Sequence, residues 1–174
     1  MSRQNIFLVG LMAVGKTTVG RVLAESLDME FFDTDKEVEG RAGADIAWIF
    51  DMEGEQGFRD REQCVVDDLT HRQGVVLATG GGVVLRENNR KALASRGVVI
   101  HLDSPVQRLV ERTRKDRKRP LLQQGDPKAV LSRLKEERGP LYEEIADYRF
   151  ITDRQSPRVL AGTIEKRLKQ DGVL

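Results

Sequence analysis

Residues 10–17 read Gly-Leu-Met-Ala-Val-Gly-Lys-Thr and match the phosphate-binding loop pattern Gly-x-x-x-x-Gly-Lys-Thr. The loop directly follows an apolar run, Ile6 to Val9, and opens a helical pattern. Because the first N–H groups of a helix have no internal partner, they and the loop's backbone N–H groups can surround a polyphosphate. The alternative is an ordinary strand-to-helix turn with a surface lysine. The match in this strand–loop–helix setting favours a nucleotide-binding chain.

The loop also predicts a role for its polar side chains. Lys16 would reach the β and γ phosphates, and the hydroxyl of Thr17 can ligate the Mg²⁺ that accompanies ATP or GTP. Gly10 and Gly15 would keep side chains away from the phosphates. The residues expected to bind ATP here are Leu11, Met12, Ala13, Val14, Gly15, Lys16, Thr17 and Thr18. The loop predicts a phosphate donor and leaves the acceptor open.

Length and charge point to one domain with small-molecule ligands. The 174 residues, 39% of them hydrophobic, suit a single domain with a buried sheet and helices on both faces. Lysine plus arginine number 29 and aspartate plus glutamate 28, so the net charge does not favour nucleic acid or an acidic membrane as a partner. No apolar run has the length of a signal segment or a membrane span, and we expect a cytoplasmic protein.

Cysteine and histidine do not indicate a metal site or a disulfide. Cys64 is the single cysteine, and the two histidines, His71 and His101, are far apart in the sequence. Because Cys64 lies in an apolar helical pattern, we expect it to be a small core residue.

Short apolar runs alternate with helical stretches, which predicts a mostly parallel sheet covered by helices. The strand candidates are Ile6–Val9, Phe31–Phe32, Val75–Ala78, Val98–Leu102 and Phe150–Ile151. A capping residue followed by proline predicts a helix start at Ser104-Pro105, Asp126-Pro127 and Ser156-Pro157.

Residues that follow the predicted strands are the candidates for ligand contact, because ligands of an open parallel sheet lie outside the carboxyl ends of its strands. After the second strand, Asp33 and Asp35 suit Mg²⁺ held through water and contact with an acceptor hydroxyl. Asp35 could instead cap a helix that starts at Lys36. After Thr79, the run Gly80-Gly81-Gly82 allows close approach of a ligand, whereas a simple tight turn needs only one or two glycines.

Two isolated arginines are weaker candidates on sequence alone. Arg59 lies in a charged helical stretch where most arginines face water, next to Phe58, which we expect in the core. Arg138 precedes Gly139-Pro140, where we expect one helix to end and another to begin. At such an end its guanidinium could bind a carboxylate at two points or simply interact with the helix dipole.

A dense basic stretch runs from Arg112 to Arg119. It lacks the interleaved aromatic residues of a nucleic-acid-binding patch. We therefore expect a mobile lid over residues 113–124 that brings one or two arginines to a phosphoryl group in transfer, although most of these side chains could simply be solvated.

Six motifs follow one another along the chain. They are the phosphate loop, Asp33-Thr34-Asp35, Gly54-Glu55-Gln56-Gly57-Phe58-Arg59, Gly80-Gly81-Gly82, Arg119-Pro120-Leu121-Leu122 and Arg138-Gly139-Pro140-Leu141-Tyr142. In this order the chain resembles the shikimate kinases over nearly its whole length. The resemblance implies an α/β nucleoside-monophosphate-kinase-like fold: a five-stranded parallel sheet of order 2-3-1-4-5 flanked by helices. It also implies one domain over residues 1–174, with an acceptor-binding helical region at about 34–62 and a lid at about 113–124.

The resemblance further implies an activity and roles for individual residues. The activity is transfer of the γ-phosphoryl of ATP to the 3-hydroxyl of shikimate, in the route to chorismate and the aromatic amino acids. The shikimate-binding residues would be Asp35, Arg59, Gly80, Gly81, Gly82 and Arg138. Of these, Arg59 and Arg138 would hold the carboxylate. The catalytic residues would be Lys16, Asp35 as proton acceptor, and Arg119. Thr17 would ligate Mg²⁺ directly and Asp33 through water, while Arg112, Arg119, Arg154 and Gln155 would complete the ATP site.

Two alternatives remain open at this point. A gluconate or nucleoside-monophosphate kinase would share the loop and the lid, and gluconate also carries a carboxylate, so substrate competition must decide. A GTPase switch or regulatory nucleotide-binding module is the non-enzyme alternative; Asp51-Met52-Glu53-Gly54 fits its loose Asp-x-x-Gly pattern, but no Asn-Lys-x-Asp motif occurs. We expect a monomer that binds shikimate and ATP, with neither nucleic acid nor membrane as partner.

Overall fold

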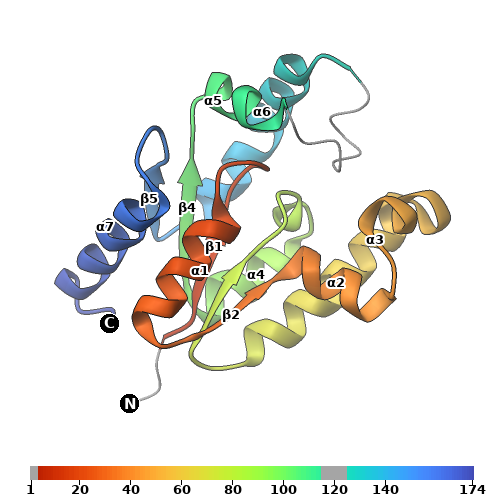
Figure 1. Ribbon diagram of the computed structural model, residues 1–174. Helices are drawn as coiled ribbons and strands as arrows, with labels where there is room; N and C mark the ends of the chain where they lie inside the picture. The colour runs from red at the N-terminus through yellow and green to blue at the C-terminus, as the bar shows by residue number, and fades with distance from the viewer. Residues whose placement is uncertain (1–3, 115–124) are drawn as a thin grey trace.

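A five-stranded parallel sheet of order β2-β3-β1-β4-β5 forms the centre of the computed structural model, which describes residues 4–114 and 125–174 (Figure 1). The strands are β1 (Ile6–Val9), β2 (Glu30–Asp33), β3 (Val75–Ala78), β4 (Val98–Asp103) and β5 (Tyr148–Ile151). Each predicted strand is present, and the predicted sheet order is confirmed. The edge strands β2 and β5 extend beyond the predicted pairs because exposed polar residues, Glu30 and Arg149, belong to them.

Helices cover both faces of the sheet (Figure 1). They are α1 (Lys16–Leu27), α2 (Thr34–Ala42), α3 (Ile46–His71), α4 (Glu87–Arg96), α5 (Val106–Thr113), α6 (Pro127–Ile145) and α7 (Pro157–Gln170), with a 3₁₀ turn, η1 (Val83–Leu85), before α4. Helix α1 packs against α7, while α4 packs against both α3 and α6. None of the helices in the described part of the chain combines the length and apolarity that a membrane crossing needs.

The three predicted helix starts differ in detail. Ser156 caps α7 as expected, its hydroxyl accepting from the N–H of Val159 at 3.2 Å. Helix α6 begins at Pro127, although the Asp126 side chain makes no capping hydrogen bond. Helix α5 begins at Val106, so the preceding proline stands at the cap position and not at the first helical one.

The buried stripe of α3 corrects the expectation for Cys64. Its neighbours Val65 and Val66 are buried, as are Phe58 and Leu69, whereas Cys64 is exposed. The apolar residues around Cys64 belong to one face of the helix, and the cysteine lies on the other face.

The central strands bring the candidate segments together. Strands β1 and β3 are buried along their whole length, as expected of continuous apolar runs between two layers of helices. In register, Ala78 of β3 lies beside Leu8 of β1 on one side and Asp33 of β2 on the other. The phosphate loop, the end of β2 and the glycine run therefore all emerge at one edge of the sheet.

Candidate active site

A cavity of about 450 Å³ opens at this edge of the sheet. Its lining residues are Met12, Ala13, Val14, Gly15, Lys16, Thr17, Thr18, Val19, Asp33, Asp35, Thr79, Gly80, Gly81, Arg112, Thr152, Gln155, Pro157 and Leu160. The phosphate loop thus shares one cavity with the acidic pair after β2 and the glycines after β3. Arg59, Gly82 and Arg138 lie just beyond this lining and are joined to it through the glycine turn.

The phosphate loop takes its shape from backbone conformations that favour glycine. Gly10 has φ of 150° and Gly15 has φ of 102°. A β-carbon on Gly10 would also overlap the carbonyl oxygen of Leu102 in β4. The Lys16 ammonium is buried and folds back over the loop, donating to the carbonyl oxygens of Gly10 and, at 2.8 Å, Leu11. Its charge therefore lies inside the loop, where a bound phosphate would meet it.

Asp33 links the end of β2 to the phosphate loop. Its Oδ2 accepts from the Thr17 hydroxyl at 2.6 Å, and its Oδ1 accepts from the N–H groups of Asp35 at 2.9 Å and Lys36 at 3.2 Å. Asp33 is thus the cap of α2, which begins at Thr34. The alternative that Asp35 caps a helix starting at Lys36 is wrong. Asp35 instead lies in the first turn of α2 with its side chain on the cavity.

The Thr17 hydroxyl and the Asp33 carboxylate offer adjacent oxygen ligands at the cavity wall. Mg²⁺ prefers such oxygens, and in nucleotide sites it takes most of its coordination from phosphate and water. Within residues 4–114 and 125–174, no cluster of three or more histidine, cysteine or acidic side chains could hold a metal by itself. This pair therefore fits a Mg²⁺ that arrives with a nucleotide.

The three glycines after β3 each lie against a different candidate residue. A β-carbon would lie 2.6 Å from Asp35 Oδ1 at Gly80, 3.5 Å from Arg138 Nη1 at Gly81, and inside the Arg59 guanidinium at Gly82. The Gly80 N–H also donates to the Thr34 hydroxyl at 2.8 Å. The run is longer than a tight turn needs because three side chains from α2, α3 and α6 approach its backbone.

Arg59 is buried, contrary to the expectation that an arginine in this charged stretch faces water. Only 5% of the residue is exposed, and its Nη1 donates to Glu62 Oε1 at 2.8 Å. The sequence did not predict a role for Glu62, which is 1% exposed; its signal in the sequence is a position one helical turn after Arg59. Burial raises the pKa of Glu62, although the charge of Arg59 opposes the shift. Among the described residues, Glu62 Oε2 has no hydrogen-bond partner.

The Gly-x-x-Gly-Phe-Arg motif that carries Arg59 has a clear local structure. Gly54, with φ of 73° and ψ of 177°, interrupts the helical backbone of α3. A β-carbon on Gly57 would approach the Glu53 Cβ to 2.5 Å, so this glycine lets the chain fold closely across the break. Phe58 is buried as predicted and packs on Phe50, with ring centroids 5.0 Å apart. The break in the helix and the contact between Phe50 and Phe58 fix the backbone position of Arg59.

Arg138 lies within one continuous helix and not at a helix end. Helix α6 runs from Pro127 to Ile145 with Pro140 inside it, so the expected boundary at Gly139-Pro140 is wrong. Buried residues on both sides of the proline, Leu134 and Tyr142, hold the helix together, although proline removes one helical hydrogen bond. Arg138 itself is 4% exposed, and the helix-dipole alternative fails because α6 ends two turns later.

Tyr142 ties α6 to the glycine turn. Its hydroxyl donates to the Gly81 carbonyl oxygen, and its ring lies 5.1 Å from that of His101 in β4. Burial raises the pKa of Tyr142 well above its usual value, so the hydroxyl keeps its proton and remains a donor. This contact fixes the backbone of Gly81 beside Arg138.

Arg112 connects the phosphate loop to the segment after β5. Its Nη1 donates to the carbonyl oxygens of Ala13 at 3.2 Å and Val14 at 3.1 Å, and its Nη2 to that of Asp153 at 3.3 Å. Gln155 lines the cavity, whereas Arg154 is exposed and absent from the described lining. These contacts place the segment after β5 beside Ala13 and Val14 of the phosphate loop.

Two further predicted ATP-site residues and most of the predicted lid lie outside the described lining or the described residues. Leu11 is a buried residue of the loop and does not belong to the described lining. Arg119 lies outside the described residues, as does most of the predicted lid, residues 115–124. Thr113, the first residue of that lid, is the buried last residue of α5.

Comparisons with known proteins identify the family of the chain. The family model described as shikimate kinase matches residues 12–169. A shikimate kinase of Vibrio parahaemolyticus is 55% identical over 168 residues, covering 97% of this chain and 98% of the relative. A solved structure of shikimate kinase from Acinetobacter baumannii in complex with shikimate superposes with a TM-score of 0.95 at 47% identity, covering 97% of this chain and 94% of that one. The chain therefore belongs to the shikimate kinase family.

Proposed function

We propose that this protein transfers the γ-phosphoryl of ATP to the 3-hydroxyl of shikimate and releases ADP and shikimate 3-phosphate. One observation carries the proposal: a phosphate loop, an acidic residue at a helix start and a glycine turn packed against two buried arginines meet at a single cavity. The Acinetobacter baumannii relative, described as a complex with shikimate, supports the choice of acceptor.

The donor side would be the phosphate loop and the start of α1. Loop N–H groups bind the polyphosphate, and the Lys16 ammonium exchanges its carbonyl acceptors for phosphate oxygens. Thr17 would hold Mg²⁺ directly and Asp33 would hold it through water, and the ion would neutralise charge on the phosphate oxygens. Arg112 and Gln155 would contact the nucleoside, since both line the same cavity as the phosphate loop.

The acceptor side would be formed by Asp35, the glycine turn and the two buried arginines. Arg59 and Arg138 bind the shikimate carboxylate, because planar guanidinium groups match a carboxylate at two points. Asp35 accepts the proton of the 3-hydroxyl as the hydroxyl oxygen attacks the γ phosphorus. The bond from that phosphorus to the β–γ bridging oxygen breaks, and ADP leaves.

Several finer assignments belong to the same proposal and rest on the sequence. Arg119 balances phosphate charge, Arg154 contacts the nucleotide, and residues 113–124 cover the site. We also propose that the protein is a cytoplasmic monomer that acts on small molecules, with neither nucleic acid nor membrane as partner. The near balance of 29 basic and 28 acidic residues supports the last point.

A coupled ADP-release assay tests the proposed function. The purified chain, ATP and Mg²⁺ are combined with shikimate, with gluconate or with nucleoside monophosphates in separate reactions. We expect ADP release that depends on shikimate and is much slower with the other acceptors. Release without any acceptor, or faster release with gluconate or a nucleotide, would refute the proposal.

A further inference from the structure

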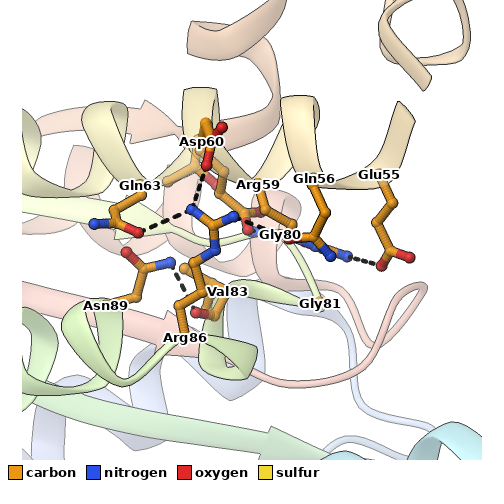
Figure 2. A network of polar contacts seen from close by, with 12 residues as sticks. Glu55, Gln56, Arg59, Asp60, Gln63, Gly80, Gly81, Val83, Arg86 and Asn89 are labelled. Carbon is orange, nitrogen blue, oxygen red and sulfur yellow. Dashed lines mark hydrogen bonds and ion pairs between the residues drawn. The ribbon is translucent and has the colours of Figure 1, made fainter. Parts of the chain in front are cut away.

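Arg86 joins the glycine turn to the helix that carries Arg59 (Figure 2). It comes directly after η1, and its carbonyl oxygen accepts from Asn89 N at 3.1 Å and Arg90 N at 3.2 Å at the start of α4. The Asn89 side chain also donates to the Val83 carbonyl oxygen at 3.0 Å. The backbone from the glycines to Arg86 is therefore fixed on α4.

The Arg86 guanidinium contacts three side chains of α3. Its Nη1 donates to Asp60 Oδ1 at 2.7 Å and to Gln63 Oε1 at 3.0 Å, and its Nη2 donates to Gln56 Oε1 at 3.1 Å. These acceptors lie one helical turn apart on one stripe of α3, beside the stripe that bears Arg59. All three follow the break at Gly54, so they belong to the helical segment that holds Arg59.

The position of α3 on the glycine turn decides where the Arg59 guanidinium lies. That guanidinium is packed so closely on Gly82 that a single β-carbon there would overlap it. Because buried, closely packed groups have no room to adjust, a small shift of α3 would move the guanidinium away from its position on the turn. Arg86, four residues after Gly82, holds α3 against the glycine turn.

We propose that Arg86 is a positioning residue for the acceptor carboxylate: it fixes α3 on the glycine turn and thereby fixes Arg59. The inference rests on the proposed function and adds to it a residue that lies outside the cavity lining. An arginine suits this task because its planar fork donates from two separate nitrogens, Nη1 and Nη2, whereas a lysine has a single nitrogen.

Steady-state kinetics of Arg86→Gln test the proposal, with Arg96→Gln as the matched control. Arg96 also joins α4 to α3, donating to Asp67 Oδ1 at 2.8 Å and Thr70 Oγ1 at 2.9 Å. The two arginine side chains are similarly exposed, 27% for Arg86 and 30% for Arg96. Both variants lose contacts that join α3 to an end of α4, since Arg86 precedes α4 and Arg96 is its last residue. Of the two, Arg86 contacts the segment around Arg59.

We expect Arg86→Gln to raise the KM for shikimate about tenfold, a fraction of what complete loss of a charge-assisted contact costs. The KM for ATP should stay within about twofold, because the polar contacts of Arg86 are to α3 and Arg86 is not among the described residues that line the cavity. Asp60→Asn, which removes only the charge of one acceptor, should raise the KM for shikimate about threefold. Arg96→Gln should leave both KM values unchanged, while lowering thermal stability about as much as Arg86→Gln.

The outcomes separate this inference from the proposed function. A wild type that does not phosphorylate shikimate would refute the proposed function. A wild type that does so, together with an Arg86→Gln variant whose KM for shikimate is unchanged, would overturn only the role of Arg86. Equal increases in the KM for shikimate and for ATP, or equal increases in Arg86→Gln and Arg96→Gln, would also overturn it. If Arg86→Gln does not fold, Asp60→Asn and Arg86→Lys supply the same comparison.

Discussion

The donor half of the site is a contiguous stretch of chain, whereas the acceptor half is assembled from separate elements. Residues 10–18 form the loop and the start of α1, and their geometry follows from local glycine conformations. Asp35 comes from α2, Arg59 from α3 and Arg138 from α6, and they meet only because the sheet and the glycine turn bring them together. Damage to the donor half should therefore remove catalysis, while damage to the two buried arginines of the acceptor half should weaken binding of one substrate.

Lys16→Ala should give the largest effect. The Lys16 ammonium is buried and donates to a carbonyl oxygen of the phosphate loop, so its positive charge lies where the phosphates would bind. Phosphoryl transfer depends on stabilising the negative charge of these phosphates. We expect kcat to fall at least about a thousandfold. The coupled assay measures the loss, and an unchanged thermal unfolding curve serves as the control. A fall of less than tenfold would contradict the donor role of Lys16.

Asp35→Asn tests the residue that we propose as the proton acceptor. The amide keeps the shape of the side chain but is a far weaker proton acceptor, so kcat should fall by about a hundredfold or more. Shikimate binding, measured by calorimetric titration, should remain, since the two arginines are intact. A near-normal kcat would remove the proton-acceptor role.

Arg138→Lys should raise the KM for shikimate without a matching rise in the KM for ATP. An ammonium cannot reproduce the two-point contact of a guanidinium, so the KM for shikimate should rise about tenfold or more. The KM for ATP should change little, because Arg138 packs on the glycine turn of the acceptor half. If both KM values rise together, Arg138 supports the whole fold and not the carboxylate site.

Asp103→Asn should affect neither half and lower stability alone. Asp103, at the end of β4, pairs with Arg149 of β5 at 2.6 Å and with Lys135 of α6 at 3.5 Å. Burial raises the pKa of Asp103, but the hydrogen bond from Arg149 and the charge of Lys135 outweigh it, so the pKa is lowered. The loss of unfolding free energy at pH 7 should be about 1 kcal/mol.

The sign of the pKa shift fixes the pH dependence of this effect. A lowered folded-state pKa means that Asp103 stabilises the fold above the usual aspartate pKa of about 4, and that this contribution is lost as pH falls through the folded value. Urea unfolding of the wild type and Asp103→Asn should therefore differ at pH 7 and converge toward pH 3. A difference that grows as pH falls would contradict the pairing.

The same contrast between local and assembled structure decided what the sequence could predict. The phosphate loop was predicted because its glycines and lysine act over neighbouring residues. Strands β1 and β3 were predicted because burial on both faces makes every residue apolar. The ends of β2 and β5 were not, since half of an edge strand is polar and resembles a loop.

The acceptor half was predicted only through the resemblance to a family. Nothing local distinguishes the buried Arg59 from an exposed helical arginine, because the difference is the Gly82 backbone against which it packs. Likewise, Gly139-Pro140 is typical of a helix end, but packing of Tyr142 beyond the proline keeps α6 continuous. Glu62 gave no signal except its spacing from Arg59.

The acceptor half should select shikimate from other small hydroxylated anions, and competition measures this selection most directly. Wild-type enzyme, ATP and Mg²⁺ are incubated with equal concentrations of shikimate and gluconate, and the products are identified by phosphorus and proton nuclear magnetic resonance. The account predicts that phosphate accumulates on the 3-hydroxyl of shikimate while gluconate remains unmodified. Accumulation of phosphorylated gluconate, of inorganic phosphate, or of shikimate modified at another hydroxyl would contradict it.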